Sequence, residues 1–176
     1  TSRGYRSCAS PRYAAMISVE PHLGEQQAHI IRQMIASLDE AYWRDRSRHK
    51  PNLGLNAEVG YYFSCGRESF PEVIRLAVDA IEPIIPGYEC EDWVVNRTPI
   101  GGGMPPHIDN EGYLAVSLLC MQSNSGEFRW YENNDLDKPR SILDKSGQLI
   151  RFNQMDLVHS VPRALSERYV IVFLYR

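Results

Sequence analysis

Hydrophobic positions follow a helical spacing in the first part of the chain and a strand-like pattern in the second. Residues 21–43 carry apolar side chains three and four positions apart, which predicts a helix that packs one face on a sheet. These side chains are Ile31, Met34, Ile35, Leu38 and Tyr42. A second helix is expected to begin with Ser69 as its N-cap and Glu72 reaching back to it, and to end before Pro83.

From residue 93 onward, short apolar runs alternate with turn residues, which is typical of β-strands. We expect strands at residues 93–98, 113–121, 126–131, 140–143, 148–153, 157–160 and 168–175. Shorter candidates precede them at residues 16–20 and 55–64. This order predicts an α+β fold, in which a double-stranded β-helix (jelly roll) is supported by two N-terminal helices. Residues 1–15 form a polar arm in this interpretation, and residues 16–176 form a single domain.

Composition narrows the choice of partners. Apolar residues make up 43% of the chain, as in ordinary globular domains, and the net charge is -3. This charge provides no general attraction to nucleic acid or to anionic membranes, so neither is a favoured partner. Cys8, Cys65, Cys90 and Cys120 lack any C-x-x-C spacing, and we interpret them as reduced thiols. No long apolar segment or signal peptide is apparent, so we expect a cytoplasmic location, with secretion left open.

The most informative motif is His107-Ile108-Asp109. In an extended segment, residues two apart leave the backbone on the same face, so the imidazole of His107 and the carboxylate of Asp109 can hold adjacent positions around a metal ion. The glycines and prolines of residues 100–106 suit a close backbone approach just before the motif. His159, after a later apolar run, is the expected third ligand. Two histidines and one carboxylate form the ligand set of non-haem Fe(II) enzymes that bind O2.

Arg168 is a second polar residue in an unusual place, because it opens the apolar run of residues 168–175. A buried guanidinium needs a carboxylate partner, preferably through a two-pronged hydrogen-bonded pair. A turn in the intervening segment would return Arg168 to the neighbourhood of His159. Its partner is then either a structural carboxylate, Glu167 or Asp156, or the carboxylate of a ligand bound beside the metal.

Several short segments of the C-terminal part occur together in a recognisable order. They are Asn96-Arg-Thr-Pro99 with the glycine run, His107-Ile-Asp109, Tyr113 to Leu119, Ser125-Gly-Glu-Phe128 for G-G-E-x-x-F, Ser146 to Phe152, His159-Ser-Val-Pro162 for H-x-V-x-P, and Glu167-Arg-Tyr169 for G-x-R-Y. Residues 93–176 therefore resemble the Fe(II)/2-oxoglutarate-dependent dioxygenase superfamily, closest in style to its prolyl-hydroxylase-like branch. Ser125 and Glu167 depart from the family by replacing glycines, and Val170 replaces a hydroxyl-bearing residue.

This resemblance implies an enzyme that uses Fe(II), 2-oxoglutarate and O2. Iron would be held by His107, Asp109 and His159, and 2-oxoglutarate would chelate it through its C1 carboxylate and keto oxygen. Arg168 would pair with the C5 carboxylate. The implied reaction decarboxylates 2-oxoglutarate to succinate and hydroxylates an amino-acid-like or peptidyl, prolyl-type substrate. An aspartate at position 109, rather than glycine or alanine, implies a hydroxylase and not a halogenase.

Further residues near the expected site have two interpretations each. Tyr61 and Asn96 are candidates for co-substrate binding, although Tyr61 and its neighbour Tyr62 fit core packing equally well. Residues 44–54 carry several basic side chains. They form either solvated surface or a flap that recognises an acidic or phosphorylated substrate.

The strand expected at residues 126–131 has two alternative inward faces. Phe128 and Trp130 alternate with Arg129 and Tyr131, so one pair faces the interior and the other faces away from it. Inward Arg129 and Tyr131 would be substrate contacts, whereas inward Phe128 and Trp130 would be ordinary core.

Three other functions remain open from the sequence. A nucleic-acid demethylase or base hydroxylase of the same superfamily would use the same ligands. A cupin-type metal-binding jelly roll would not use 2-oxoglutarate, and Arg168 would then be structural. A catalytically inactive relative would produce no succinate.

Overall fold

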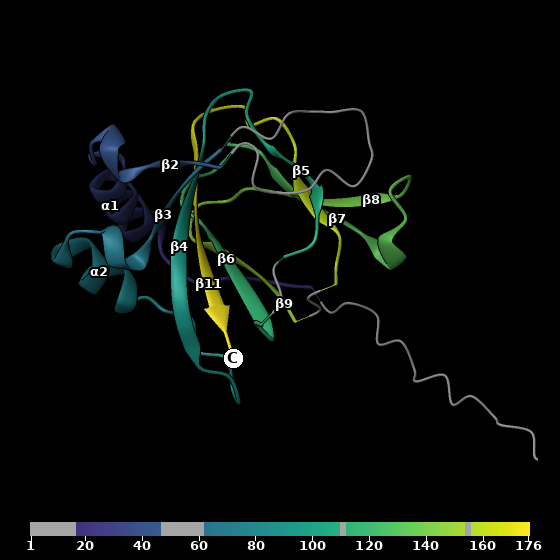
Figure 1. Cartoon of the computed structure of the whole chain (residues 1–176), viewed down its shortest axis with the longest axis horizontal. Helices are drawn as coiled ribbons and strands as arrows, with labels where there is room; N and C mark the ends of the chain where they lie inside the picture. The colour runs from purple at the N-terminus through teal and green to yellow at the C-terminus, as the bar shows by residue number, and fades with distance from the viewer. Residues whose placement is uncertain (1–16, 47–61, 110–111, 154–155) are drawn as a thin grey trace, which may run out of the picture.

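The computed structural model describes residues 17–46, 62–109, 112–153 and 156–176, which form two antiparallel sheets that pack against each other (Figure 1). In spatial order, the larger sheet contains β1 (Ser18–Pro21), β9 (Gln148–Phe152), β6 (Ala115–Cys120), β11 (Arg168–Tyr175), β4 (Cys90–Thr98), β3 (Phe63–Gly66) and β2 (Arg44–Asp45). The smaller sheet contains β5 (Met104–His107), β10 (His159–Val161), β7 (Glu127–Tyr131) and β8 (Pro139–Leu143).

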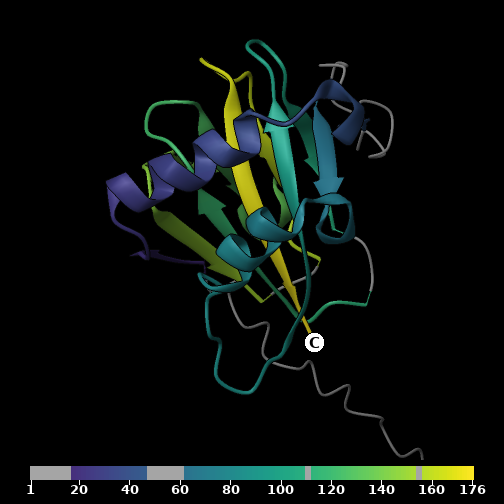
Figure 2. The same ribbon diagram turned by 90° about the vertical axis from the view of Figure 1, so that its left-hand side faces the viewer.

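Two helices, α1 (Glu25–Ala36) and α2 (Glu72–Asp79), lie across the outer face of the larger sheet (Figure 2). Their buried side chains are Ala28, Ile31, Ile35, Ile74 and Val78. Along β11, Ile171 and Phe173 belong to the cluster under the helices, while Val172 belongs to the cluster between the sheets. This burial on both faces explains the uninterrupted apolar run of β11. None of the helices in the described ranges is long and apolar enough to cross a membrane.

The first helix is shorter than the apolar pattern predicts, because it ends at Ala36 rather than near Trp43. A separate 3-10 helix at Glu40–Tyr42 follows, with Asp39 as its capping side chain. Trp43 is buried and packs on Tyr169 of β11, with 6.0 Å between the ring centroids. The apolar residues beyond Ala36 therefore reflect packing against the core and not the continuation of the helix.

Ser69 does not cap the second helix, contrary to the prediction. It lies in a preceding 3-10 helix, and α2 begins at Glu72 with Pro71 as an N-cap that makes no side-chain hydrogen bond. Phe70 is extended, buried, and packed on Trp93 with 5.2 Å between ring centroids. We attribute the difference to this burial, because the inserted ring separates Ser69 from the helix.

Phe128 and Trp130 of β7 pack in the cluster between the two sheets, as the core alternative predicts, but Tyr131 of the other pair is also buried. Phe128 is only 1% exposed and packs with residues of β6 and β9. Arg129 forms an ion pair with Glu127 of the same strand. The Tyr131 hydroxyl lies 3.0 Å from Ser160 Oγ on β10, which ties the two strands together.

Three of the four cysteines lie in the described ranges, and all three are free thiols, as the sequence predicts. Burial raises the pKa of Cys65 and Cys90 to about 11, and that of Cys120 to about 12. All three thiols therefore stay protonated at neutral pH. Cys8 lies outside the described residues.

The packing of α2 on the sheet predicts different effects for two valines of this helix. Val78 is 0% exposed, whereas Val73 is 63% exposed. Val78→Ala should lower the free energy of unfolding by about 2 kcal/mol through lost apolar burial and a residual cavity. Val73→Ala should change it by less than about 0.5 kcal/mol. Urea unfolding followed by circular dichroism measures both, and equal effects would contradict the packing of α2 through Val78.

Candidate metal centre

Three of the predicted ligands meet where β5 and β10 pair. The antiparallel register sets His159, the first residue of β10, opposite His107, the last residue of β5. Their ring centroids are 4.3 Å apart. Asp109 follows two residues after His107, and one ligand atom from each of the three side chains lies within 4.8 Å of the others. The pairing of two short strands therefore gathers ligands that are far apart in sequence.

Hydrogen bonds to the backbone orient both imidazoles for metal binding. The Nδ1 atom of His107 lies 2.7 Å from the carbonyl oxygen of Pro105, and that of His159 lies 3.0 Å from the carbonyl oxygen of Leu157. Because a carbonyl oxygen only accepts, Nδ1 must carry the proton in each ring, so Nε2 is the unprotonated nitrogen that could bind a metal.

The Nε2 atoms of both imidazoles face the carboxylate of Asp109. His107 Nε2 lies 3.7 Å from Oδ1, and His159 Nε2 lies 3.6 Å from Oδ2. These separations are too long for hydrogen bonds, but adjacent ligands about 2.1 Å from one metal ion lie roughly 3 Å apart. Small side-chain movements would place all three on a single cation. The donor set therefore fits a divalent metal with three protein ligands and open positions.

Aromatic side chains wall the site on one side. The rings of Phe128 and Phe152 lie 5.5 Å and 5.3 Å from the ring of His159, measured between centroids. Both phenylalanines are 1% exposed. An apolar wall of this kind holds the imidazole in place and limits the access of water to a bound metal.

The candidate metal ligands open onto a cavity of about 220 Å³ between the two sheets. Asn96 of β4 lines this cavity and lies opposite Ser64 of β3 and Val170 of β11. The expectation that Asn96 binds a co-substrate therefore remains a prediction, with the residue in a position to do so. Tyr61 lies outside the described residues.

Tyr62 and Arg46 also line the cavity, on the side of β3. Burial raises the pKa of Tyr62 to about 12, opposed by nearby Arg46 and reinforced by Asp109, so its hydroxyl stays a neutral donor at neutral pH. Arg46 belongs to the basic segment noted in the sequence, and its Nε donates to Ser64 Oγ (3.0 Å). The basic composition of residues 44–54 suggested a role for this segment, but the local sequence could not show that Arg46 in particular lines the cavity.

Arg168 lines the same cavity, and its carboxylate partner is Asp144. The residue is 2% exposed; its Nε donates to Asp144 Oδ2 (2.7 Å) and its Nη2 donates to Oδ1 (2.9 Å). Burial alone would lower the pKa of the guanidinium, but the charge and hydrogen bonds of Asp144 outweigh it and raise the pKa. Glu167, one of the expected partners, instead accepts from Arg97 (2.7 Å). Sequence reasoning missed Asp144, which looks like an ordinary turn residue.

Comparisons with known proteins find solved structures of the same architecture. No protein-family model and no curated protein sequence matches the chain. A prolyl-4-hydroxylase from Pseudomonas putida is 15% identical, with a TM-score of 0.62 over 91% of this chain and 92% of that one. A prolyl hydroxylase from Trichoplax adhaerens, in complex with a peptide of hypoxia inducible factor, is 19% identical, with a TM-score of 0.63 over 90% and 82%. HygX from Streptomyces hygroscopicus, with nickel and 2-oxoglutarate bound, is 13% identical, with a TM-score of 0.60 over 90% and 82%.

The chain has the fold of the 2-oxoglutarate- and Fe(II)-dependent oxygenases. The resemblance seen in residues 93–176 is thus confirmed for the fold, and the predicted jelly roll with two supporting helices is confirmed with it. In this oxygenase fold, the candidate metal ligands lie at the cavity between the sheets.

Replacing any of the three ligands should abolish tight metal binding. His107→Ala, Asp109→Ala and His159→Ala each remove one donor, and we expect Ni(II) affinity to fall by more than about a hundredfold in each. Anaerobic calorimetric titration measures this, with the exposed His29→Ala as the control. Wild-type affinity in any of the three variants would remove that residue from the site.

The close approach of β5 to β10 predicts a further effect at Gly103. A Cβ atom at this position would lie 2.5 Å from the carbonyl oxygen of Val161, so the strands would have to separate. Gly103→Ala should therefore weaken Ni(II) binding by about tenfold and destabilise the fold by about 1–3 kcal/mol. At Gly66 an added Cβ meets nothing within 4 Å, so Gly66→Ala is the matched control. Unchanged metal affinity in Gly103→Ala would refute the dependence on strand spacing.

Proposed function

We propose that the protein is an Fe(II)- and 2-oxoglutarate-dependent dioxygenase that hydroxylates a C–H bond of an amino-acid-like or peptidyl, prolyl-type substrate. The observation that carries this proposal is the convergence of His107, Asp109 and His159, with both imidazoles held by Nδ1 and both Nε2 atoms facing the carboxylate of Asp109. This donor set leaves open positions for a chelating co-substrate and for O2.

In the proposed reaction, the residues of the chain bind and orient the reactants. Nε2 of each histidine and one oxygen of Asp109 would hold Fe(II). When bound, iron and 2-oxoglutarate would activate O2, which is the oxidant: one oxygen atom would enter succinate as CO2 is released, and the other would enter the substrate. Since Asp109 supplies a carboxylate ligand, the arrangement favours hydroxylation over halogenation. Phe128 keeps one wall of the metal site apolar, which excludes water from the reacting atoms.

The distal carboxylate of 2-oxoglutarate would be bound by Arg168. Two of the donor nitrogens of its guanidinium serve Asp144, and no hydrogen bond from Nη1 is found within the described ranges. Arg168 also lines the cavity that contains the metal ligands, so Nη1 is the donor left for a ligand. Asn96 and Tyr62 line the same space and are the further candidates for polar contacts with the co-substrate. Tyr61 stays a prediction from the sequence.

The substrate class rests on the structural relatives and on the charge of the chain. Two of the similar structures are prolyl hydroxylases, and one of these was solved with a peptide bound. The net charge of -3 does not favour a nucleic-acid substrate, which would profit from a basic surface. We therefore favour an amino-acid-like or peptidyl substrate over a nucleic-acid base.

One observation favours a second candidate, a metal-binding jelly roll that does not use 2-oxoglutarate. The ion pair with Asp144 balances the charge of the Arg168 guanidinium without any ligand. A structural arginine would have such a partner, so this alternative must be tested directly.

The test is to mix the protein with Fe(II) and 2-oxoglutarate under anaerobic conditions and to measure the weak visible absorption band of the chelate. Arg168→Gln should weaken 2-oxoglutarate by about 2 kcal/mol, roughly thirtyfold, because a charge-assisted contact is lost. Iron affinity should not change. The exposed Arg140→Gln is the control for general charge effects.

Succinate release in the presence of O2 then tests turnover. A wild-type protein that binds Fe(II) but produces neither the chelate band nor succinate would support the alternative without 2-oxoglutarate. Equal 2-oxoglutarate affinity in Arg168→Gln and wild type would refute the role of Arg168 alone.

A further inference from the structure

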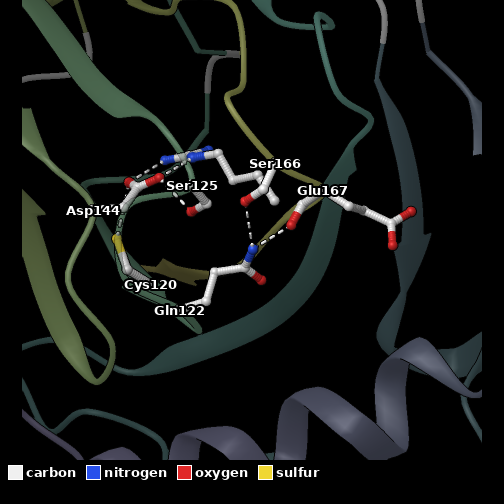
Figure 3. Close-up of polar contacts among 7 residues, drawn as sticks. Cys120, Gln122, Ser125, Asp144, Ser166 and Glu167 are labelled. Atoms are coloured by element: carbon white, nitrogen blue, oxygen red, sulfur yellow. Dashed lines mark hydrogen bonds and ion pairs between the residues drawn. The ribbon is translucent and has the colours of Figure 1, made fainter.

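A fully buried ion pair lies beside the cavity. The side chains of Arg168 and Asp144 are 3% and 0% exposed. Asp144 follows β8 in a turn, and its carboxylate accepts from the Ser125 hydroxyl (2.8 Å to Oδ2) and from the Cys120 thiol (3.5 Å to Oδ1) (Figure 3). Together with the two bonds from Arg168, four donors converge on one carboxylate.

Asp144 fixes the orientation of the guanidinium. A two-pronged bond through Nε and Nη2 holds the plane of Arg168 in the plane of the carboxylate. The backbone of Gly126 covers this pair, because a Cβ atom there would lie 3.5 Å from both Arg168 Cδ and Asp144 Oδ2. Nη1 has no hydrogen-bond partner among the residues described, and Arg168 lines the cavity. The Nη1 group of the guanidinium is therefore held in one direction.

We propose that Asp144 is a positioning residue for the co-substrate: it holds Arg168 so that Nη1 receives the distal carboxylate of 2-oxoglutarate. This inference rests on the proposed function. Asp144 acts through Arg168 and does not touch the ligand itself, since the carboxylate of Asp144 is 0% exposed.

Two effects of Asp144 oppose each other. Its negative charge repels a second carboxylate across the guanidinium, whereas its hydrogen bonds keep the guanidinium in place. Positioning wins, because an arginine deprived of its partner in this buried place would be an uncompensated charge and would not keep its orientation. The other nearby carboxylate, Glu167, already accepts from Arg97. Hydrogen bonds from Ser125 and Cys120 also stabilise the negative charge of Asp144, which reduces the repulsion.

The experiment compares two 2-oxo acids that differ only at the far end. 2-Oxopentanoate has the carbon chain of 2-oxoglutarate but ends in a methyl group, so it can chelate Fe(II) without needing Arg168. In Asp144→Asn loaded with Fe(II) under anaerobic conditions, 2-oxoglutarate should bind roughly tenfold more weakly than in wild type. The affinities for 2-oxopentanoate and for Fe(II) should stay within about twofold of wild type. The exposed Asp137→Asn is the matched control.

A double-mutant cycle separates positioning from a general structural effect. In the Arg168→Gln background, Asp144→Asn should cause no further loss of 2-oxoglutarate affinity, because the residue through which it acts is already absent. Unchanged or tighter 2-oxoglutarate binding in Asp144→Asn would overturn the proposal. An equal loss for both 2-oxo acids, or a further loss in the Arg168→Gln background, would also overturn it.

A second variant decides the question if Asp144→Asn does not fold. Ser125→Ala keeps the ion pair but removes one donor that orients the carboxylate, and should weaken 2-oxoglutarate about threefold without affecting 2-oxopentanoate. No change there would overturn the proposal in that case. Failure of the wild type to bind 2-oxoglutarate would instead refute the proposed function, so the two failures are distinguishable.

Discussion

The antiparallel pairing of β5 with β10 is the contact on which the candidate site depends. It sets His159 opposite His107 and brings Asp109 to both of them. Neither strand is long, so this register is kept by what surrounds it: the missing side chain at Gly103 and the hydrogen bond between Tyr131 and Ser160 that joins β10 to β7. A small slip of these strands would separate the two imidazoles, which both lie on strands, whereas Asp109 lies two residues beyond the end of β5.

The larger sheet also lines the cavity, and β11 lies at the middle of this sheet. One face of β11 packs under the helices through Ile171 and Phe173, while the other faces the smaller sheet. Arg168 is the first residue of this strand. Its backbone is held in place because β11 pairs with both β4 and β6. The helices thus contribute to the site indirectly, by fixing the strand that carries the arginine.

Much of this arrangement could be predicted from the sequence, because it is written in local patterns. Short apolar runs between turn residues predict the strands of the C-terminal part, and the spacing of His107 and Asp109 predicts two ligands on one face. His159 and the run that begins at Arg168 follow from their apolar surroundings. The limits of the helices were less predictable, since burial of Trp43 and Phe70 in the shared core overrides local helix signals.

Asp144 could not be predicted, and the reason is physical. Its local sequence, Asp-Lys-Ser-Gly, is that of a surface turn, yet its side chain is completely buried. Only the tertiary structure brings this turn to the start of β11, where the charge of Arg168 compensates that of Asp144. The same limit applies to Arg46, which the sequence places in a basic segment and the fold places in the wall of the cavity.

The ion pair between Arg168 and Asp144 also has a consequence for folding. A lone guanidinium in the barrel would make a newly made chain depend on an incoming anion to complete its interior. Because Asp144, Ser125 and Cys120 are all encoded in the chain, that charge is balanced as soon as the strands associate. Under the proposed function, the interior around Arg168 would therefore need neither metal nor 2-oxoglutarate to balance its charge during folding.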